Sequence, residues 1–281
     1  MKVDLCVFLA GNDLDVYTPI FFEMLQRNCD ISNLCIHVVE KGTFDAGPPI
    51  EDGKYEPDMK DYIPGVGEKV HNYLLKLQKE WGIPFTIYEK HDPTEFFLQA
   101  TPREPCYHMP SDHANTLHWA MDNCGTNKWI IFCHSDAIIC KDIITRLMAD
   151  MNNETGMYGM FDRCWAVNRE AYKKVGVRFN SISAFMAQEF NGDYFKYRIK
   201  HINDPQCTDY SKPIFGWDTG ELTELIMIAH GWRCVTHDNA ELYPYVQHGG
   251  SGHGYSNRQD FVDHRISTLL NLLKGLGIQR L

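Results

Sequence analysis

The sequence predicts an α/β protein with a mostly parallel, doubly wound sheet. Continuous apolar runs rich in β-branched residues, such as residues 3–9 (VDLCVFL) and 129–133 (WIIFC), are typical of strands buried on both faces of a sheet. The segments between these runs space their apolar residues three and four positions apart, as amphipathic helices do. Strand and helix therefore alternate through the first half of the chain, the order expected of a Rossmann-like twisted sheet with helices on both faces.

The elements of this first half each carry a local signal. At residues 18–28, Thr18 is the expected N-cap and Pro19 the first helical residue. Residues 42–67 hold many Gly, Pro and Asp residues without a period and indicate a loop. The apolar stripe of the next helix is Val70, Tyr73, Leu74, Leu77 and Trp81. The expected elements are strand 3–9, helix 18–28, strand 33–42, helix 67–82, strand 84–90, helix 111–123, strand 127–136 and helix 141–151.

The alternation of strand and helix loosens in the second half. Residues 157–176 indicate a strand pair followed by a short helix. Residues 219–231 indicate a helix with Gly231 past its end, and residues 258–277 a final helix. Residues 188–213 are polar and irregular, a pattern typical of a lid or an acceptor loop.

The bulk composition argues against several classes of function. The 281 residues are 44% hydrophobic, enough for a packed core, and the net charge is −10. An acidic chain is not expected to bind nucleic acid by neutralising its phosphates. The acidic net charge is still compatible with one local basic pocket for a nucleotide. The ten cysteines form no CxxC pair and indicate reduced thiols in a cytoplasmic protein. No signal peptide and no apolar run of ~20 residues is evident, so we expect no transmembrane segment, with peripheral membrane contact left open.

Polar residues stand where three of the predicted strands end. The first strand ends at Ala10–Asp13, the second at Glu40 and the fourth at His134–Asp136. In open α/β sheets, ligands bind beyond the carboxyl ends of the strands, and these ends lie along one edge. We therefore expect Asn12 or Asp13, Glu40 and the HSD triplet to surround one crevice.

The triplet His134, Ser135 and Asp136 points to a divalent cation. An aspartate at the end of a buried strand is a hard oxygen ligand suited to Mg²⁺ or Mn²⁺, and an imidazole suits Mn²⁺ better than Mg²⁺. Such an ion would stabilise a diphosphate leaving group. A Ser–His–Asp relay is excluded because adjacent residues at a strand end point in alternating directions.

Residues 111–139 (SDHANTLHWAMDNCGTNKWIIFCHSDAII) resemble the core of family-2-like glycosyltransferases with the GT-A fold, in the nucleotide-diphospho-sugar transferase superfamily. In that family a helix with a polar start leads into an apolar strand that ends in Asp-x-Asp. Here His134 stands at the first Asp, and Asp136 holds the second position, the usual metal ligand of the family. The resemblance implies an Asp-x-Asp-like motif with Mn²⁺ or Mg²⁺ at Asp136.

Residues 215–235 (FGWDTGELTELIMIAHGWRCV) are similar to the family's Glu-Asp element and the helix that follows it. Trp217 stands where Glu is common, and Asp218 matches the Asp that is the general base in inverting members. Asp218 and Glu221 also fit a capping box, Asp-x-x-Glu, so capping alone would explain both residues. Both interpretations stay open, and Glu221 is the weaker candidate for the base.

Residues 245–257 (YVQHGGSGHGYSN) match the place where many members carry a histidine that reaches back to the metal. His248 fits that position, with His253 as the alternative. Arg169 is expected to be structural. The resemblance implies donor contacts from the ends of the first, second and fourth strands and from the helix before the fourth. The implied donor-binding residues are Ala10, Asn12, Glu40, His113, His134 and Ser135.

These features together predict a metal-dependent glycosyltransferase that moves a sugar from a nucleotide-diphosphate donor to an acceptor hydroxyl, with inversion. The acceptor would be a glycan, a lipid-linked molecule or a small molecule. We expect one GT-A-like domain over residues 1–281, with a nucleotide-binding half at 1–136, an acceptor and catalytic half at 137–255 and a C-terminal helix at 256–281.

Two other functions fit the same fold. The first is a glycan- or nucleotide-binding protein that has lost catalysis, which His134 and Trp217 at acidic family positions would explain. The second is a sugar-nucleotidyltransferase. That class carries a Gly-rich basic segment after the first strand, whereas residues 10–17 (AGNDLDVY) hold one Gly and no base.

Overall fold

The computed structural model describes residues 1–10, 17–41, 43–44, 62–90, 108–161, 163–177, 179, 220–236, 239–248 and 259–275. The elements of the first half are β1 (Val3–Ala10), α1 (Tyr17–Asn28), β2 (Leu34–Lys41), β3 (Thr43–Phe44), β4 (Tyr62–Ile63), α2 (Glu68–Glu80), β5 (Phe85–Lys90), α4 (His108–Asn123) and β6 (Trp129–His134). Those of the second half are β7 (Ala137–Ile139), α5 (Ile143–Asp150), β8 (Thr155–Met160), β9 (Cys164–Asn168), α6 (Arg169–Val175), α9 (Glu221–Ala229), β10 (Arg233–Val235), β11 (Val246–His248) and α10 (Gln259–Gly275).

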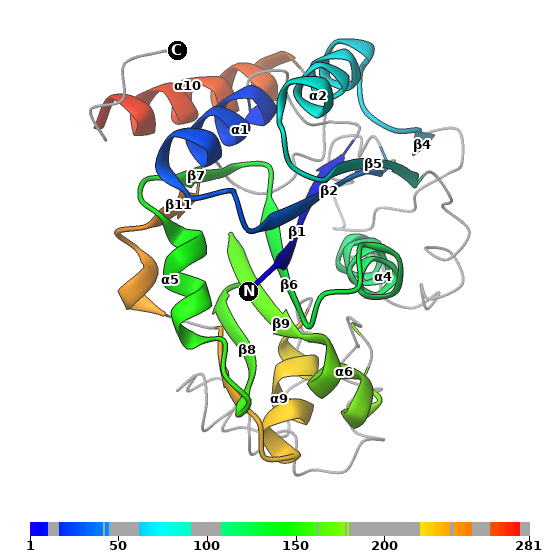
Figure 1. Ribbon diagram of the computed structural model, residues 1–281. Coiled ribbons are helices and arrows are strands. Elements are labelled where there is room, and N and C mark those ends of the chain that lie inside the picture. Colours follow the sequence, from blue (N-terminus) through cyan, green and yellow to red (C-terminus); the bar gives the residue numbers. More distant parts are fainter. Residues whose placement is uncertain are drawn as a thin grey trace, which may run out of the picture.

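Seven strands form one sheet in the order β10-β8-β9-β6-β1-β2-β5. Strands β6, β1, β2 and β5 run parallel to one another, while β9 is antiparallel to both β6 and β8. Strand β10 is again parallel to β8. The prediction of a mixed α/β fold with a mostly parallel sheet is confirmed, as are the strand pair and short helix expected near residue 160 (Figure 1).

Helices cover both faces of this sheet. Apolar side chains of α1, α2 and α5 form one buried cluster with alternate residues of β1, such as Leu5 and Val7. The other residues of β1, such as Cys6 and Phe8, join a second cluster with α4, α6 and α9. This alternation explains the unbroken apolar run of the first strand, since each side chain is buried on one face or the other. Helix α10 lies beside α1 (Figure 1), where Leu269 packs in a small cluster with residues of α1 and β7.

Several local predictions needed correction. Helix α1 begins at Tyr17, so Thr18 lies in its first turn and is not the N-cap. The expected loop at 42–67 contains a short ribbon, because β3 and β4 pair in antiparallel fashion. Helix α4 begins at His108, three residues before the expected start. The two three-residue strands β7 and β11, which pair with each other, were not predicted at all.

The eight cysteines in the described part of the chain are all free thiols, as the sequence indicated. Most lie in the core, and Cys133 of β6 and Cys164 of β9 face each other across the antiparallel pair with their Sγ atoms 2.7 Å apart. Burial is the main reason that the pKa of the Cys133 thiol lies well above its ordinary value, and the contact with Cys164 raises this pKa further. These cysteines therefore pack as small apolar side chains.

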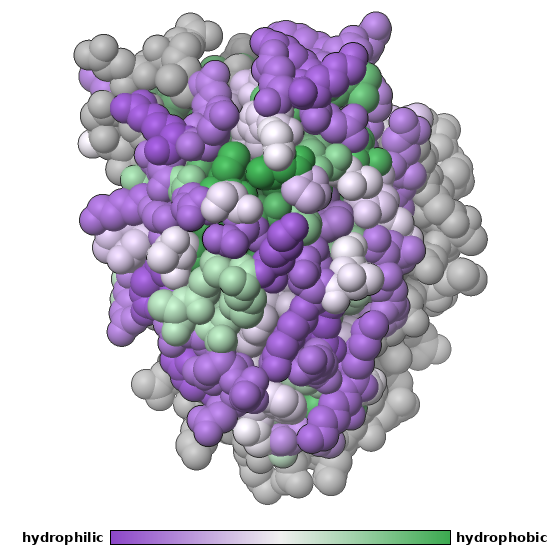
Figure 2. Space-filling view, in the orientation of Figure 1, coloured by the Kyte–Doolittle hydropathy of each residue, from purple (hydrophilic) through white to green (hydrophobic). Residues whose placement is uncertain are grey.

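The visible face of the molecule is mainly hydrophilic, with one band of hydrophobic residues above its centre (Figure 2). Among the residues whose side chains are described, the exposed large hydrophobic ones are Met1, Tyr243 and Leu270. None of the described helices combines the length and the apolar character needed to cross a bilayer.

Candidate functional site

The site begins where β6 ends. Residues 129–133 are buried, and the backbone N–H of His134 still donates to the carbonyl of Arg163, at 2.9 Å. The chain then turns at Ser135 and Asp136 and enters β7. Ser135 and Asp136 are 1% and 2% exposed. The turn thus holds a carboxylate inside the protein at the carboxyl edge of the sheet, the edge at which parallel α/β folds bind ligands.

The pairing of β11 with β7 brings a histidine to this carboxylate. In the antiparallel register His248 lies opposite Ala137, the residue after Asp136. The His248 Nε2 atom is 3.3 Å from Oδ2 of Asp136, and the imidazole is about one quarter exposed. The two residues expected as metal ligands are therefore in contact, although 112 positions separate them in the sequence.

His134 is a neutral imidazole in this setting. Burial is the main reason that its pKa falls to about 3, and the positive charges of His248 and Lys41 lower it further. Its ring packs edge-on against Trp165, with the ring centroids 5.6 Å apart. At neutral pH His134 therefore contributes a nitrogen atom to the site without adding a charge.

Lys41 is a cation at the same edge that the sequence reasoning missed. It ends β2 opposite Ala10, the last residue of β1, and it is only 7% exposed. It is also close enough to His134 to lower that residue's pKa. A lysine at the last position of a buried strand was the available signal, because such a residue is rarely buried without a partner or a function.

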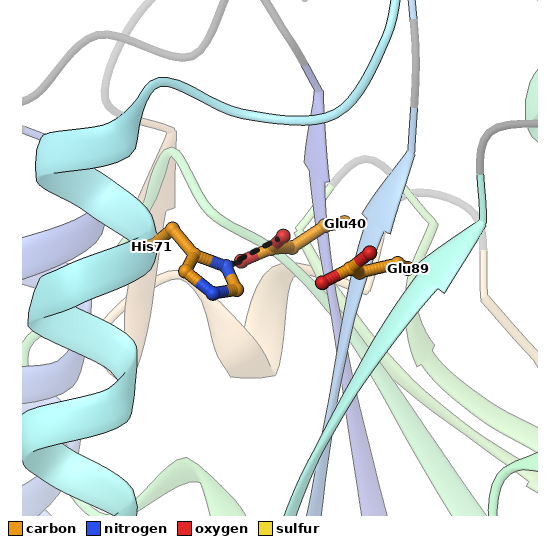
Figure 3. A group of neighbouring side chains, drawn as sticks. All are labelled: Glu40, His71 and Glu89. Carbon is orange, nitrogen blue, oxygen red and sulfur yellow. Dashed lines mark hydrogen bonds and ion pairs between the residues drawn. The ribbon is translucent and has the colours of Figure 1, made fainter.

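Glu40 is buried at the carboxyl end of β2 and contacts a helix. The Nδ1 atom of His71, on α2, lies 2.8 Å from Oε1 and 3.0 Å from Oε2 of Glu40. In the parallel register of β2 and β5, Glu40 also lies beside Glu89. Figure 3 shows the imidazole facing the Glu40 carboxylate, with Glu89 on the neighbouring strand. The sequence analysis named Glu40 but neither of these neighbours.

Helix α9 does not begin with the expected capping box. Its N-cap is Gly220, and Glu221 is its first residue instead of the third. The N–H of Glu224 donates to the Gly220 carbonyl, as it should at that helix start. The capping-box register expected from the sequence is therefore wrong, and Asp218 itself lies outside the described residues.

Two of the remaining predicted residues are described by their backbone alone. The backbone of Ala10 ends β1, and His113 lies in α4, with their side chains outside the described part. Asn12, Asp13, Trp217, Asp218 and His253 lie outside the described residues.

Arg169 is structural, as the sequence indicated. Its side chain is buried, donates to the backbone carbonyls of Met121 and Cys124, and lies 3.2 Å from Asp4 Oδ2. Asp4 is at the start of β1, so this contact is at the opposite edge of the sheet from Asp136.

No family model matches the chain, and no curated protein matches it. Among solved structures, it resembles the mannosyltransferase PcManGT from Pyrobaculum calidifontis, in complex with GDP-Man and Mn²⁺, with 11% identity and a TM-score of 0.47 over 98% of this chain and 64% of that one. It also resembles mouse xyloside xylosyltransferase 1, with 10% identity and a TM-score of 0.47 over 90% of this chain and 99% of that one. A third is the glycosyltransferase GlyE of Streptococcus pneumoniae TIGR4, with 10% identity and a TM-score of 0.42 over 100% of this chain and 65% of that one.

These similar structures are all glycosyltransferases by name. The chain spans less than two thirds of the PcManGT and GlyE chains. At such low identity, the argument for function rests on the side chains at the carboxyl edge of the sheet.

Proposed function

We propose that this protein is a glycosyltransferase that moves a sugar from a nucleotide-diphosphate donor to an acceptor hydroxyl. The observation that carries the proposal is the contact of Asp136 with His248, 3.3 Å apart at the carboxyl edge of the sheet. The turn after β6 and the β7–β11 pair hold these side chains in place. Lys41 adds a positive charge at the same edge, and the predicted diphosphate would carry negative charge.

The residues fit a divalent cation. Ligands around an ion bound at ~2.1 Å lie about 3.0–3.4 Å from one another, which is the separation of the Asp136 and His248 atoms. One carboxylate with imidazole nitrogen suits Mn²⁺ better than Mg²⁺. Asp136 and His248 would hold the ion, which when bound would stabilise the charge of the departing nucleoside diphosphate.

The remaining roles follow the sequence resemblance. The donor would lie across the ends of β1, β2 and β6, in contact with Ala10, Asn12, Glu40, His113, His134 and Ser135. Asp218 would take the proton of the acceptor hydroxyl as it attacks the anomeric carbon, which gives inversion. The N-cap of α9 is Gly220, so the capping box expected at Asp218 and Glu221 does not compete with this role. In this proposal residues 1–136 bind the donor and residues 137–255 the acceptor.

Thermal-shift screening tests the proposal most directly. UDP, GDP, CDP and dTDP would each be added with and without Mn²⁺, and a nucleotide that binds only the folded protein raises the melting temperature by mass action. We expect one nucleotide to stabilise the protein only when Mn²⁺ is present. Asp136→Ala should abolish that stabilisation, whereas Asp122→Asn, at an exposed position of α4, should leave it unchanged. Absence of any shift from all four nucleotides would contradict the proposal.

Catalysis needs a separate test, because an inactive binding protein would also show the thermal shift. Transfer or donor hydrolysis would be measured with the sugar form of the nucleotide that binds. Asp218→Asn should leave nucleotide binding unchanged and reduce turnover at least roughly 100-fold, as expected for loss of a general base. Binding without any turnover by the wild-type protein would favour the inactive alternative.

A further inference from the structure

Two carboxylates lie side by side on the neighbouring strands β2 and β5. Glu40 of β2 and Glu89 of β5 are partners in the parallel register, so their side chains project from the same face of the sheet. Like charges at such positions repel each other. Glu40 is 3% exposed, which strengthens the repulsion because little water screens it. A positive charge between the two carboxylates would therefore be stabilising.

A histidine from the covering helix completes a group of three. One ligand atom from each of Glu40, His71 and Glu89 can be chosen so that all three lie within 4.8 Å of one another. The three residues come from β2, α2 and β5, which are separate in the sequence and adjacent in the fold (Figure 3). The imidazole nitrogen already lies 2.8 Å and 3.0 Å from the two Glu40 oxygens.

We propose that Glu40, His71 and Glu89 bind a divalent transition-metal ion. Two carboxylates and a neutral imidazole carry a charge of about −2, which one divalent cation balances. Neighbouring ligands of an ion at ~2.1 Å are separated by about 3.0–3.4 Å, close to the His71–Glu40 separation. The Glu89 carboxylate would complete the site from the neighbouring strand, since its ligand atom lies within 4.8 Å of those of Glu40 and His71.

The mixed ligand set selects among metals. Imidazole nitrogen favours Zn²⁺ over Mg²⁺ and Ca²⁺, and Zn²⁺ binds nitrogen and oxygen ligands more tightly than Mn²⁺ does. Three protein ligands leave at least one coordination position for water or a hydroxyl group of a ligand. The site shares Glu40 with the proposed donor contacts but neither of the metal ligands Asp136 and His248, and β1 separates β2 from β6 in the sheet.

Calorimetric titration with Zn²⁺ tests this site, and Asp136→Ala protein is used throughout so that the other predicted metal site is absent. We expect one saturable site on this protein. His71→Asn and Glu89→Gln, added separately, should each weaken Zn²⁺ binding at least roughly 10-fold. The His71 side chain is partly exposed and Glu89 is exposed, so these variants should fold. Mg²⁺ should compete poorly.

Matched controls use the same residue types on the same or a similar helix. Glu80→Gln changes an exposed acid at the end of α2, and His230→Gln changes an exposed histidine after α9, so neither should alter Zn²⁺ affinity. The absorption of bound Co²⁺ should lack the thiolate charge-transfer band that cysteine ligands would give.

Three results would overturn the proposal. They are no saturable binding, unchanged affinity in His71→Asn or Glu89→Gln, and a thiolate band with Co²⁺. The first would leave Glu40 and His71 as a hydrogen-bonded pair alone. None of these results bears on nucleotide-dependent thermal shifts of the wild-type protein, so failure of this site and failure of the proposed glycosyltransferase activity are distinguishable.

Discussion

Two buried aspartates lie at opposite ends of the neighbouring strands β1 and β6. Asp4 stands near the start of β1 and is 1% exposed, whereas Asp136 follows the end of the parallel strand β6 and is 2% exposed. Asp4 accepts from the backbone and the side-chain amide of Asn127, at 3.0 Å and 2.7 Å, and lies 3.2 Å from both His37 and Arg169. Asp136 instead faces the partly exposed imidazole of His248.

This difference separates a structural carboxylate from a functional candidate. Burial raises the pKa of Asp4, but hydrogen bonds from His37 and Asn127 and the charges of His37 and Arg169 outweigh it, and the pKa is held below 3.8. A guanidinium is always charged and cannot be displaced without breaking the core. An imidazole can lose its proton and become a metal ligand. The partners of a buried acid therefore indicate its role better than its burial does.

The largest expected effect comes from the same substitution made at both aspartates. Asp4→Asn should lower the free energy of unfolding by about 3–5 kcal/mol, because Arg169 would stay buried without its countercharge. Asp136→Asn should leave stability unchanged or raise it, since a site arranged for a ligand is commonly destabilising when that ligand is absent. Urea denaturation of both variants at pH 7 measures the two values. Equal losses of stability would contradict the contrast drawn between the two edges.

A smaller effect is expected from the glycine that packs against Asp4. Gly125 has φ +77°, and a Cβ added there would lie 2.4 Å from Oδ1 of Asp4. Gly125→Ala should therefore cost roughly 1–3 kcal/mol, from backbone strain together with displacement of the carboxylate. Gly176→Ala is the matched control, because it has φ +70° but no atom within 4 Å of its added Cβ. The difference in unfolding free energy between the variants isolates the contact with Asp4, and no difference would argue against a rigid network.

The sequence predicted one of these edges better than the other. An apolar run interrupted at residues 134–136 is visible without a structure, so the Asp136 edge could be located. The contact with His248 depends on the β7–β11 pair, whose three-residue strands are too short to show a period. The prediction of a capping box at Asp218 and Glu221 was wrong because the sequence motif does not fix the residue at which α9 begins. That start depends on the fold.

The partners of Glu40 and Asp136 and the start of α9 could not be predicted for the same physical reason. His71 was visible in an amphipathic helix, but its place over the end of β2 depends on how α2 packs on the sheet. The ends of strands are local properties of the sequence, whereas partners across the sheet depend on tertiary packing. A sequence therefore indicates where a site lies more readily than which side chains complete it.

A third expected effect depends on pH and tests whether Asp4 is ionised in the folded protein. Its folded pKa lies below the unfolded value, so its ionisation stabilises the protein above the unfolded pKa, and this contribution is lost as the pH falls through the folded pKa. Stability should therefore decrease below about pH 4 more steeply in wild-type protein than in Asp4→Asn. Urea denaturation at pH 7, 5, 4 and 3 gives both curves. Parallel curves would show that Asp4 carries no perturbed ionisation.

The smallest expected effect is at a third aspartate, which has a cationic partner but is more than half exposed. Asp122 of α4 lies 3.8 Å from Lys173, and both side chains are more than half exposed. Asp122→Asn should change the free energy of unfolding by less than about 0.5 kcal/mol, because water and salt screen an exposed pair. The measurement is urea denaturation at 0.1 M and at 1 M NaCl, with Asp4→Asn alongside. If Asp122→Asn lowered the free energy of unfolding nearly as much as Asp4→Asn does, a cationic partner would be stabilising whether or not the pair is buried. The strength of the Asp4 network would then not depend on its burial.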